Sequence, residues 1–172
     1  MIKMSEEFEI RNKVNESGLV NFDLAQLVPK GARKGIDLKD FLFQEMILKE
    51  KDFREKVAAI NTEDYTDTYI HIYNSADAIV PLWAYFVLTA KLTGVAKKIV
   101  FGNREDLEVI LMHNAIQTYD FDDLIGKRVL VKGCSDKEIP ENAYVELVEQ
   151  LQPIVKSLMF GEACSNVPIL KN

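Results

Sequence analysis

Both cysteines of the chain fall in short polar segments that follow predicted strands. Gly133-Cys134-Ser135-Asp136 follows one strand, and Glu162-Ala163-Cys164-Ser165 follows another. In an open α/β sheet, ligands usually bind beyond the carboxyl ends of the strands. Thiolates at Cys134 and Cys164, with a carboxylate from Asp136 or Glu162, could supply three ligands to zinc or iron. Cys134, Asp136 and Cys164 are therefore the candidate metal ligands, and Ser135 and Glu162 are candidates to line the site.

The same segment has other interpretations. A thiol beside a helix N-terminus has a lowered pKa, so Cys134 could equally be a reactive nucleophile. Ser135-Asp136-Lys137-Glu138 is also a good capping box, with Ser135 as the cap and Glu138 reaching back. A cysteine at a strand end is more often packed than ligating. The chemistry of this segment stays open at this point.

Gly133-Cys134-Ser135-Asp136, followed by Pro140, resembles the Cys-Ser-Asp loop of the β-class carbonic anhydrases. That resemblance implies zinc binding by the cysteine after a strand. The family has an arginine two residues after the aspartate, where this chain has Glu138, and no histidine follows Cys134. We therefore do not expect carbonic anhydrase activity.

An internal repeat places a related segment, Ser75 to Asp77, after an earlier strand. Residues Thr68–Gly102 align with Lys127–Gly161 without a gap, and nine of the 35 positions are identical. Such self-similarity is typical of a duplicated structural unit. Ser75 occupies the place of Cys134, so Ser75 and Asp77 are further candidates to line a site. Asp77 and Asp136 could also simply cap their helices.

The residue patterns predict the elements of this repeat. Tyr69–Tyr73 and Arg128–Lys132 alternate like strands, Leu147 and Leu151 recur at helical spacing, and Lys97–Phe101 and Lys156–Phe160 return as apolar strands. A further amphipathic helix lies between the copies. Parallel pairing is the default for such an order. We predict one α/β domain over residues 1–172, a single layered domain with a mostly parallel sheet built from the duplicated strand–helix–strand unit.

Residues 1–60 form an N-terminal strand and helix segment in this interpretation. The apolar spacing from Leu38 to about Ala59 predicts one long helix with Asp37 as its cap. Of the two histidines, His71 lies in a strand and His113 on a helix, and neither has a partner at catalytic spacing. We assign no catalytic residue.

The helix predicted over Pro81–Leu92 is apolar nearly all round. Such a helix is either central in its domain or pressed against another subunit. Trp83, Tyr85 and Phe86 are therefore candidate interface residues, and we favour a homodimer.

Composition excludes several classes of protein. The net charge of −6 gives no basic face for nucleic acid. The longest apolar run, Ala78–Thr89, is too short for the ~20 residues of a membrane crossing. Two cysteines in 172 residues do not form a disulfide framework, which favours the cytoplasm.

The whole chain resembles an uncharacterised bacterial family, domain of unknown function 2480. The resemblance runs from Ser17-Gly18-Leu19 through Glu50–Arg54 and Ser75–Pro81 to Phe160-Gly161-Glu162-Ala163-Cys164-Ser165. The stretches Lys132–Pro140 and Lys156–Pro168 are the most specific part of the match. Genes of that family are often found near iron–sulfur assembly genes, so the resemblance implies a link to sulfur or metal handling.

Three hypotheses about function follow. The leading one is a cytosolic protein with a thiol or metal site at Cys134 and Cys164, serving sulfur or iron–sulfur metabolism. The second is a noncatalytic dimerisation or protein-interaction module that uses Pro81–Leu92. The third, an enzyme acting on a small molecule with Asp77, Asp136 and Cys134, ranks last.

Overall fold

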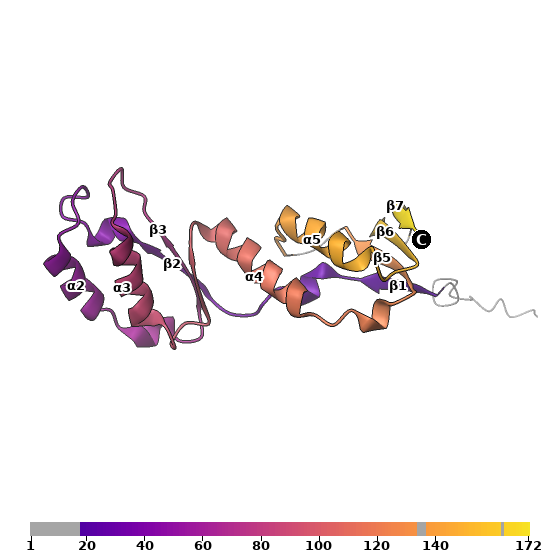
Figure 1. Ribbon diagram of the computed structural model, residues 1–172, viewed down its shortest axis with the longest axis horizontal. Helices are drawn as coiled ribbons and strands as arrows, with labels where there is room; N and C mark the ends of the chain where they lie inside the picture. The colour runs from indigo at the N-terminus through magenta and orange to yellow at the C-terminus, as the bar shows by residue number, and fades with distance from the viewer. Residues whose placement is uncertain (1–17, 134–136, 163) are drawn as a thin grey trace, which may run out of the picture. The chain divides into compact units, whose positions relative to one another are not determined.

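The computed structural model describes residues 18–133, 137–162 and 164–172. These residues form an α/β structure with two separate sheets, one of four strands and one of three (Figure 1). Each sheet belongs to a compact unit of the chain. Unit 1 comprises Met1–Gln26, Tyr119–Glu138 and Tyr144–Asn172, and unit 2 comprises Leu27–Thr118 and Ile139–Ala143.

Unit 2 contains a fully parallel sheet of order β2-β3-β4. Figure 1 shows α2 and α3 side by side in this unit. Its elements are β2 (Arg33–Asp37), η2 (Leu38–Phe41), α2 (Glu50–Ala58), η3 (Thr62–Tyr65), β3 (Tyr69–Tyr73), α3 (Leu82–Leu92), β4 (Lys98–Phe101) and α4 (Arg104–Thr118).

The core of unit 2 lies between the sheet and helices α2 and α3. Alternation along β3 buries Ile70 and Ile72 on one side of the strand. α3 buries Ala84, Leu88 and Leu92, which recur every four residues along one side of the helix. Phe53 and Val57 of α2 complete the same cluster.

Unit 1 contains a sheet of order β1-β5-β6-β7 in which only the β6–β7 pair is antiparallel. The central strand β5 buries three consecutive residues, as expected for a strand covered on both sides. The remaining elements are β1 (Leu19–Phe22), η1 (Leu24–Leu27), η4 (Asp122–Leu124), β5 (Arg128–Lys132), α5 (Glu141–Leu151), β6 (Ser157–Glu162) and β7 (Ser165–Lys171). Of these, η1 and α5 each have residues in both units.

The pairing β3–β4 has the same register as the pairing β5–β6. Tyr69 lies opposite Lys98, and Arg128 opposite Ser157. Just before β4, the Lys97 N–H donates to the carbonyl of Thr68, which precedes β3, at 2.8 Å. Just before β6, the Lys156 N–H donates in the same way to the carbonyl of Lys127, which precedes β5, at 2.7 Å. The two sequence copies therefore have matching strand geometry.

The strand–helix–strand–helix–strand–helix–strand order predicted after residue 68 is found, but the prediction of one sheet is wrong. β4 and β5 lie in different sheets, because β5 pairs with β1 instead. Apolar alternation identifies a buried strand without specifying its lateral neighbours. The assignment of residues 1–172 to a single folding domain stays a prediction.

The long helix predicted from Leu38 to Ala59 is also wrong. Asp37 does cap a helix, since its carboxylate accepts a hydrogen bond from the Lys39 N–H, but that 3₁₀ helix ends at Phe41. Gln44 and Glu45 then have φ values of 50° and 58°, which no α-helix contains. α2 begins only at Glu50.

A search of the described residues finds no helix long and apolar enough to cross a membrane.

The burial of one helix face gives a stability prediction. Leu147→Ala should lower the free energy of unfolding by about 2–5 kcal/mol, because Leu147 is buried under the unit 1 sheet. Glu149→Ala on the exposed side of the same helix should change it by less than about 0.5 kcal/mol. Urea unfolding followed by circular dichroism measures both. Equal effects of the two substitutions would contradict the packing of α5.

Candidate functional site

The carboxyl ends of β2 and β3 bring Asp37 and Ser75 together. Both the N–H and the Oγ hydroxyl of Ser75 donate hydrogen bonds to the Asp37 carboxylate. The Lys39 N–H donates a third. Ser75, predicted as a site-lining residue, therefore does lie at a strand end beside a carboxylate.

These hydrogen bonds change the acidity of Asp37. Burial by itself would raise the pKa of Asp37. The hydrogen bonds from Ser75 and from the Lys39 backbone, with the positive charge of Lys39, outweigh burial and hold the pKa below its ordinary value. Asp37 therefore stays ionised at neutral pH and accepts hydrogen bonds only.

Asp37 was not predicted as a site residue, and neither was Asp23 at the end of β1. The Asp23 carboxylate accepts a hydrogen bond from the Ala25 N–H at 3.0 Å, as Asp37 does from Lys39. Both aspartates follow an apolar strand residue and precede a buried leucine, Leu24 or Leu38. This repeated Asp-Leu pair, 14 residues apart, is the sequence signal that could have found them.

The side chain of Asn74 holds the loop around Ser75 through two hydrogen bonds to the loop backbone. Asn74 accepts from the Ala76 N–H at 3.1 Å and donates to the Ala78 carbonyl at 3.0 Å. Helix α3 begins after this loop with Pro81 at its N-cap and no side-chain cap. The interpretation of Asp77 as a helix cap is therefore wrong. Asp77 is exposed, four residues before that cap.

The carboxyl ends of β5 and β6 are adjacent in unit 1. A Cβ atom placed on Gly133 would lie 3.4 Å from the Gly161 Cα. Glu162 ends β6, and Cys164 follows in the turn to β7 as an exposed free thiol. Cys134, Ser135 and Asp136 lie outside the described residues.

No group of three or more histidine, cysteine or acidic residues that could hold a metal ion occurs within residues 18–133, 137–162 and 164–172.

Two lysines flank the segment that contains Cys134 and contact the start of η1. Lys132 Nζ lies 3.5 Å from the Asp23 carboxylate. Lys137 Nζ donates to the Ala25 carbonyl at 2.8 Å. This end of the unit 1 sheet is therefore polar, with charged groups beside the segment.

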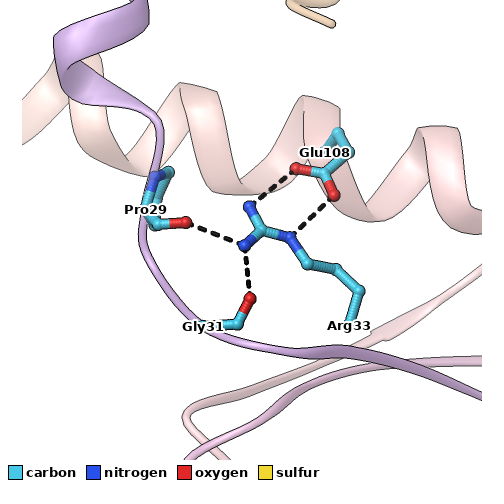
Figure 2. A network of polar contacts seen from close by, with 4 residues as sticks. All are labelled: Pro29, Gly31, Arg33 and Glu108. Carbon is cyan, nitrogen blue, oxygen red and sulfur yellow. Dashed lines mark hydrogen bonds and ion pairs between the residues drawn. The ribbon is translucent and has the colours of Figure 1, made fainter. Parts of the chain in front are cut away.

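Arg33 makes the most extensive polar network in the part of unit 2 that the structure describes (Figure 2). Its guanidinium donates twice to the Glu108 carboxylate, at 2.9 and 3.0 Å, and also to the Pro29 and Gly31 carbonyls. The hydrogen bond with Glu108 raises the pKa of Arg33 despite its burial. Because its donors are used within the chain, this arginine anchors the segment before β2 to α4 instead of binding an anion.

The three predicted interface residues differ in exposure. Trp83 packs edge-to-face on Phe53 at 5.5 Å within unit 2. Tyr85 is half-buried against Phe101 at 5.3 Å, and burial raises the pKa of its hydroxyl. Phe86, in contrast, is 73% exposed. Only Phe86 of the three is largely free of its own unit.

His71 is half-buried in β3. Its ring stacks on Tyr73 at 5.3 Å, and its Nδ1 is buried with no hydrogen-bond partner among the described residues. The ring lies against Gly35, where an added Cβ would approach within 2.8 Å. A side chain at position 35 would therefore force the His71 ring to shift.

An apolar cavity of about 90 Å³ lies beside α5 and β6 in unit 1. It is lined by Val131, Tyr144, Leu147, Val148, Leu158, Met159, Phe160 and Ile169. Ligand sites combine apolar walls with a few converging polar groups, and this lining offers almost none. The cavity is therefore a packing feature of the core.

The Asp37–Ser75 contact gives a prediction with a defined pH dependence. Ser75→Ala should raise the pKa of Asp37, measured by ¹³C NMR titration of its carboxyl group. A carboxylate with a lowered pKa stabilises the fold above the unfolded pKa of about 3.9, and this stabilisation is lost as the pH falls through the folded pKa. Ser75→Ala should therefore cost about 0.5–1 kcal/mol at pH 7, and less once the pH has fallen through the folded pKa of Asp37.

Ser165→Ala, at an exposed serine of β7, is the control and should leave the Asp37 titration unchanged. An Asp37 pKa that stays low in Ser75→Ala would show that the hydroxyl does not stabilise the carboxylate.

Comparison with known proteins agrees with the family resemblance of the strand-end segments. The family model described as protein of unknown function (DUF2480) matches residues 8–172. No curated protein and no solved structure matches the chain. The matched region contains every element of both units, so the chain belongs to the DUF2480 family of proteins of unknown function.

Proposed function

We propose that this protein is a noncatalytic interaction module of the cytoplasm and that unit 2 forms a homodimer through one exposed apolar surface. The α3 surface consists of Ile79, Leu82 and Phe86, with Phe101 at the end of β4. These side chains are 93%, 75%, 73% and 71% exposed, respectively. Large apolar side chains exposed as a group are typical of protein interaction sites.

The α3 surface is a connected feature of unit 2. Leu82 and Phe86 are four residues apart on α3 and so share one side of the helix. Tyr85, beside them on the helix, contacts the Phe101 ring edge-to-face at 5.3 Å. The opposite side of α3 is already packed in the core. The helix is apolar all round because one side meets its own sheet and the other is available to a partner.

The internal repeat supports this assignment. We infer that the strand–helix–strand unit is duplicated, because strand registers, the lysine hydrogen bonds and the buried leucines at 88 and 147 correspond. The positions equivalent to Ile79 and Leu82 are Glu138 and Glu141. The same backbone thus carries acids in one copy and apolar residues in the other. The fold therefore does not require apolar residues at positions 79 and 82, so an interaction explains these two better. The equivalents of Phe86 and Phe101 are the apolar residues Val145 and Phe160.

Substitution of the α3 surface tests the dimer. Wild-type protein should have about twice the 19.6 kDa chain mass by size-exclusion chromatography with light scattering. Phe86→Glu should make the protein monomeric, because burying an unpaired carboxylate at an interface costs at least about 2 kcal/mol, roughly a 30-fold loss of affinity. Val145→Glu, at the equivalent position of α5, is the matched control and should stay dimeric. A wild-type monomer would refute the proposal.

A thiol or metal site is the second candidate, and one observation favours it. The ends of β5 and β6 are adjacent at Gly133 and Gly161, and Cys134 directly follows Gly133 in the chain. This adjacency supports a zinc or iron site of Cys134, Asp136 and Cys164, with Ser135 and Glu162 beside it. Such a site would fit a role in sulfur or iron–sulfur metabolism.

Metal analysis of protein purified without a histidine tag tests this candidate. Zinc or iron should bind at about one equivalent per chain, and Cys134→Ser or Cys164→Ser should lower its affinity at least tenfold, as loss of a thiolate ligand does. Asp77→Asn is the matched control, because Asp77 is the counterpart of Asp136 in the other copy. Protein that binds neither metal after reconstitution would refute the site.

A further inference from the structure

The outer edge of β4 is open in unit 2, although the equivalent edge is closed in unit 1. In unit 1, β6 pairs with β5 on one side and with the antiparallel strand β7 on the other. In unit 2, β4 pairs with β3, and no strand of the described residues pairs with its other side. An unpaired edge strand is a template for another strand.

The backbone of β4 presents specific groups at this edge. The Gly102 N–H bonds to the Ile72 carbonyl of β3 at 3.0 Å. Backbone groups alternate in direction along a strand, so the N–H and C=O groups of Ile99 and Phe101 point away from β3. The equivalent residues of β6, Leu158 and Phe160, lie opposite Leu170 and Val167 of β7.

The equivalent phenylalanines of β4 and β6 differ in exposure. Phe101 and Phe160 each contact the tyrosine of their helix, Tyr85 or Tyr144, edge-to-face with interplanar angles of 88°. Phe160, beside β7, is 38% exposed, whereas Phe101 is 71% exposed. The two rings are placed alike, and the one without a neighbouring strand is far more exposed.

We propose that the β4 edge pairs antiparallel with β4 of a second copy, so that two three-stranded sheets become one six-stranded sheet. This inference rests on the proposed homodimer and adds its geometry. The outward groups of Ile99 in one copy bond with those of Phe101 in the other. The two-fold axis then passes beside Val100, which faces its own counterpart in a non-hydrogen-bonded pair.

A second copy fits this edge in shape. A crossover helix lies over the two strands that it joins, and neighbouring strands are about 4.8 Å apart. The two α3 helices would therefore lie about 10 Å apart across the axis, close to the normal distance for packed helices. Leu82 and Phe86 would then be covered by the other copy, so one contact explains both the open edge and the exposed helix.

A second copy also fits in charge. Lys97 precedes β4 and Lys98 begins it, and the first turn of α4, with Arg104 and the two acids Glu105 and Asp106, follows the strand. Antiparallel pairing places the basic start of each strand beside the end that leads into the acidic turn of the other. The complementarity occurs twice in the dimer. Parallel pairing would instead place lysine beside lysine.

Cysteine cross-linking tests the pairing in a Cys134→Ser/Cys164→Ser background whose dimeric mass is first verified. Val100→Cys should form a disulfide-linked dimer under mild oxidation, because facing residues of a non-hydrogen-bonded pair have Cα atoms about 4.5 Å apart. Lys98→Cys is the matched control on the same strand. Its two copies would be about 14 Å apart, beyond the reach of a disulfide.

Ile99→Pro provides a second measurement, because proline removes the outward N–H without touching the bonds to β3. It should weaken dimerisation at least tenfold while circular dichroism stays unchanged, and Ile99→Val should not. The strand pairing would be overturned if Phe86→Glu dissociates the dimer while Val100→Cys fails to cross-link it and Ile99→Pro fails to weaken it. That result would leave the proposed dimer through the α3 surface intact. A wild-type monomer would overturn both.

Discussion

Parallel strand pairing is the constraint on which the rest of this structure depends. Two parallel strands cannot be joined by a hairpin, so the chain must cross the sheet and cover it on the way. In unit 2 this requirement produces α3, whose Leu88 packs on the sheet. In unit 1 it produces α5, with Leu147 in the equivalent place. Parallel pairing also gathers the carboxyl ends of neighbouring strands at one edge, where Asp37 meets Ser75.

The local elements were predictable from the sequence because each one is encoded in a short stretch. Alternation identifies β3 and β5, and helical spacing identifies α4 and α5. The sheets were not predictable, because β1, a strand of four residues, pairs with β5 more than a hundred residues later. The break between η2 and α2 was also missed. It depends on two successive residues with positive φ, Gln44 and Glu45, that apolar spacing does not detect.

The candidate site residues were also only partly predictable from the sequence. Ser75 lies after the end of β3, as the element order predicts, whereas its role in a site stays a prediction. The partner of Ser75 was missed because Asp37 was considered only as a helix cap, although one carboxylate does both. Trp83 was predicted as an interface residue from its apolarity, but its indole packs inside unit 2. Sequence thus identifies apolar side chains without showing which side of the helix is already covered.

The proposed function rests on features that differ between the two copies of the repeat, namely the sheet edge and the exposed apolar residues. Equivalent backbones have equivalent requirements, so a feature present in only one copy is not needed for the fold. β7 closes the edge of the unit 1 sheet, and the sequence around the start of α5 has Glu138 and Glu141 where the other copy has Ile79 and Leu82. In unit 2, no strand of the described residues pairs with the outer side of β4, and the four most exposed large apolar side chains are those of Ile79, Leu82, Phe86 and Phe101. An open strand edge and an exposed apolar helix could each arise alone. Because both occur in unit 2, we infer a surface that receives a strand and a helix together. Only a folded partner provides both elements at once.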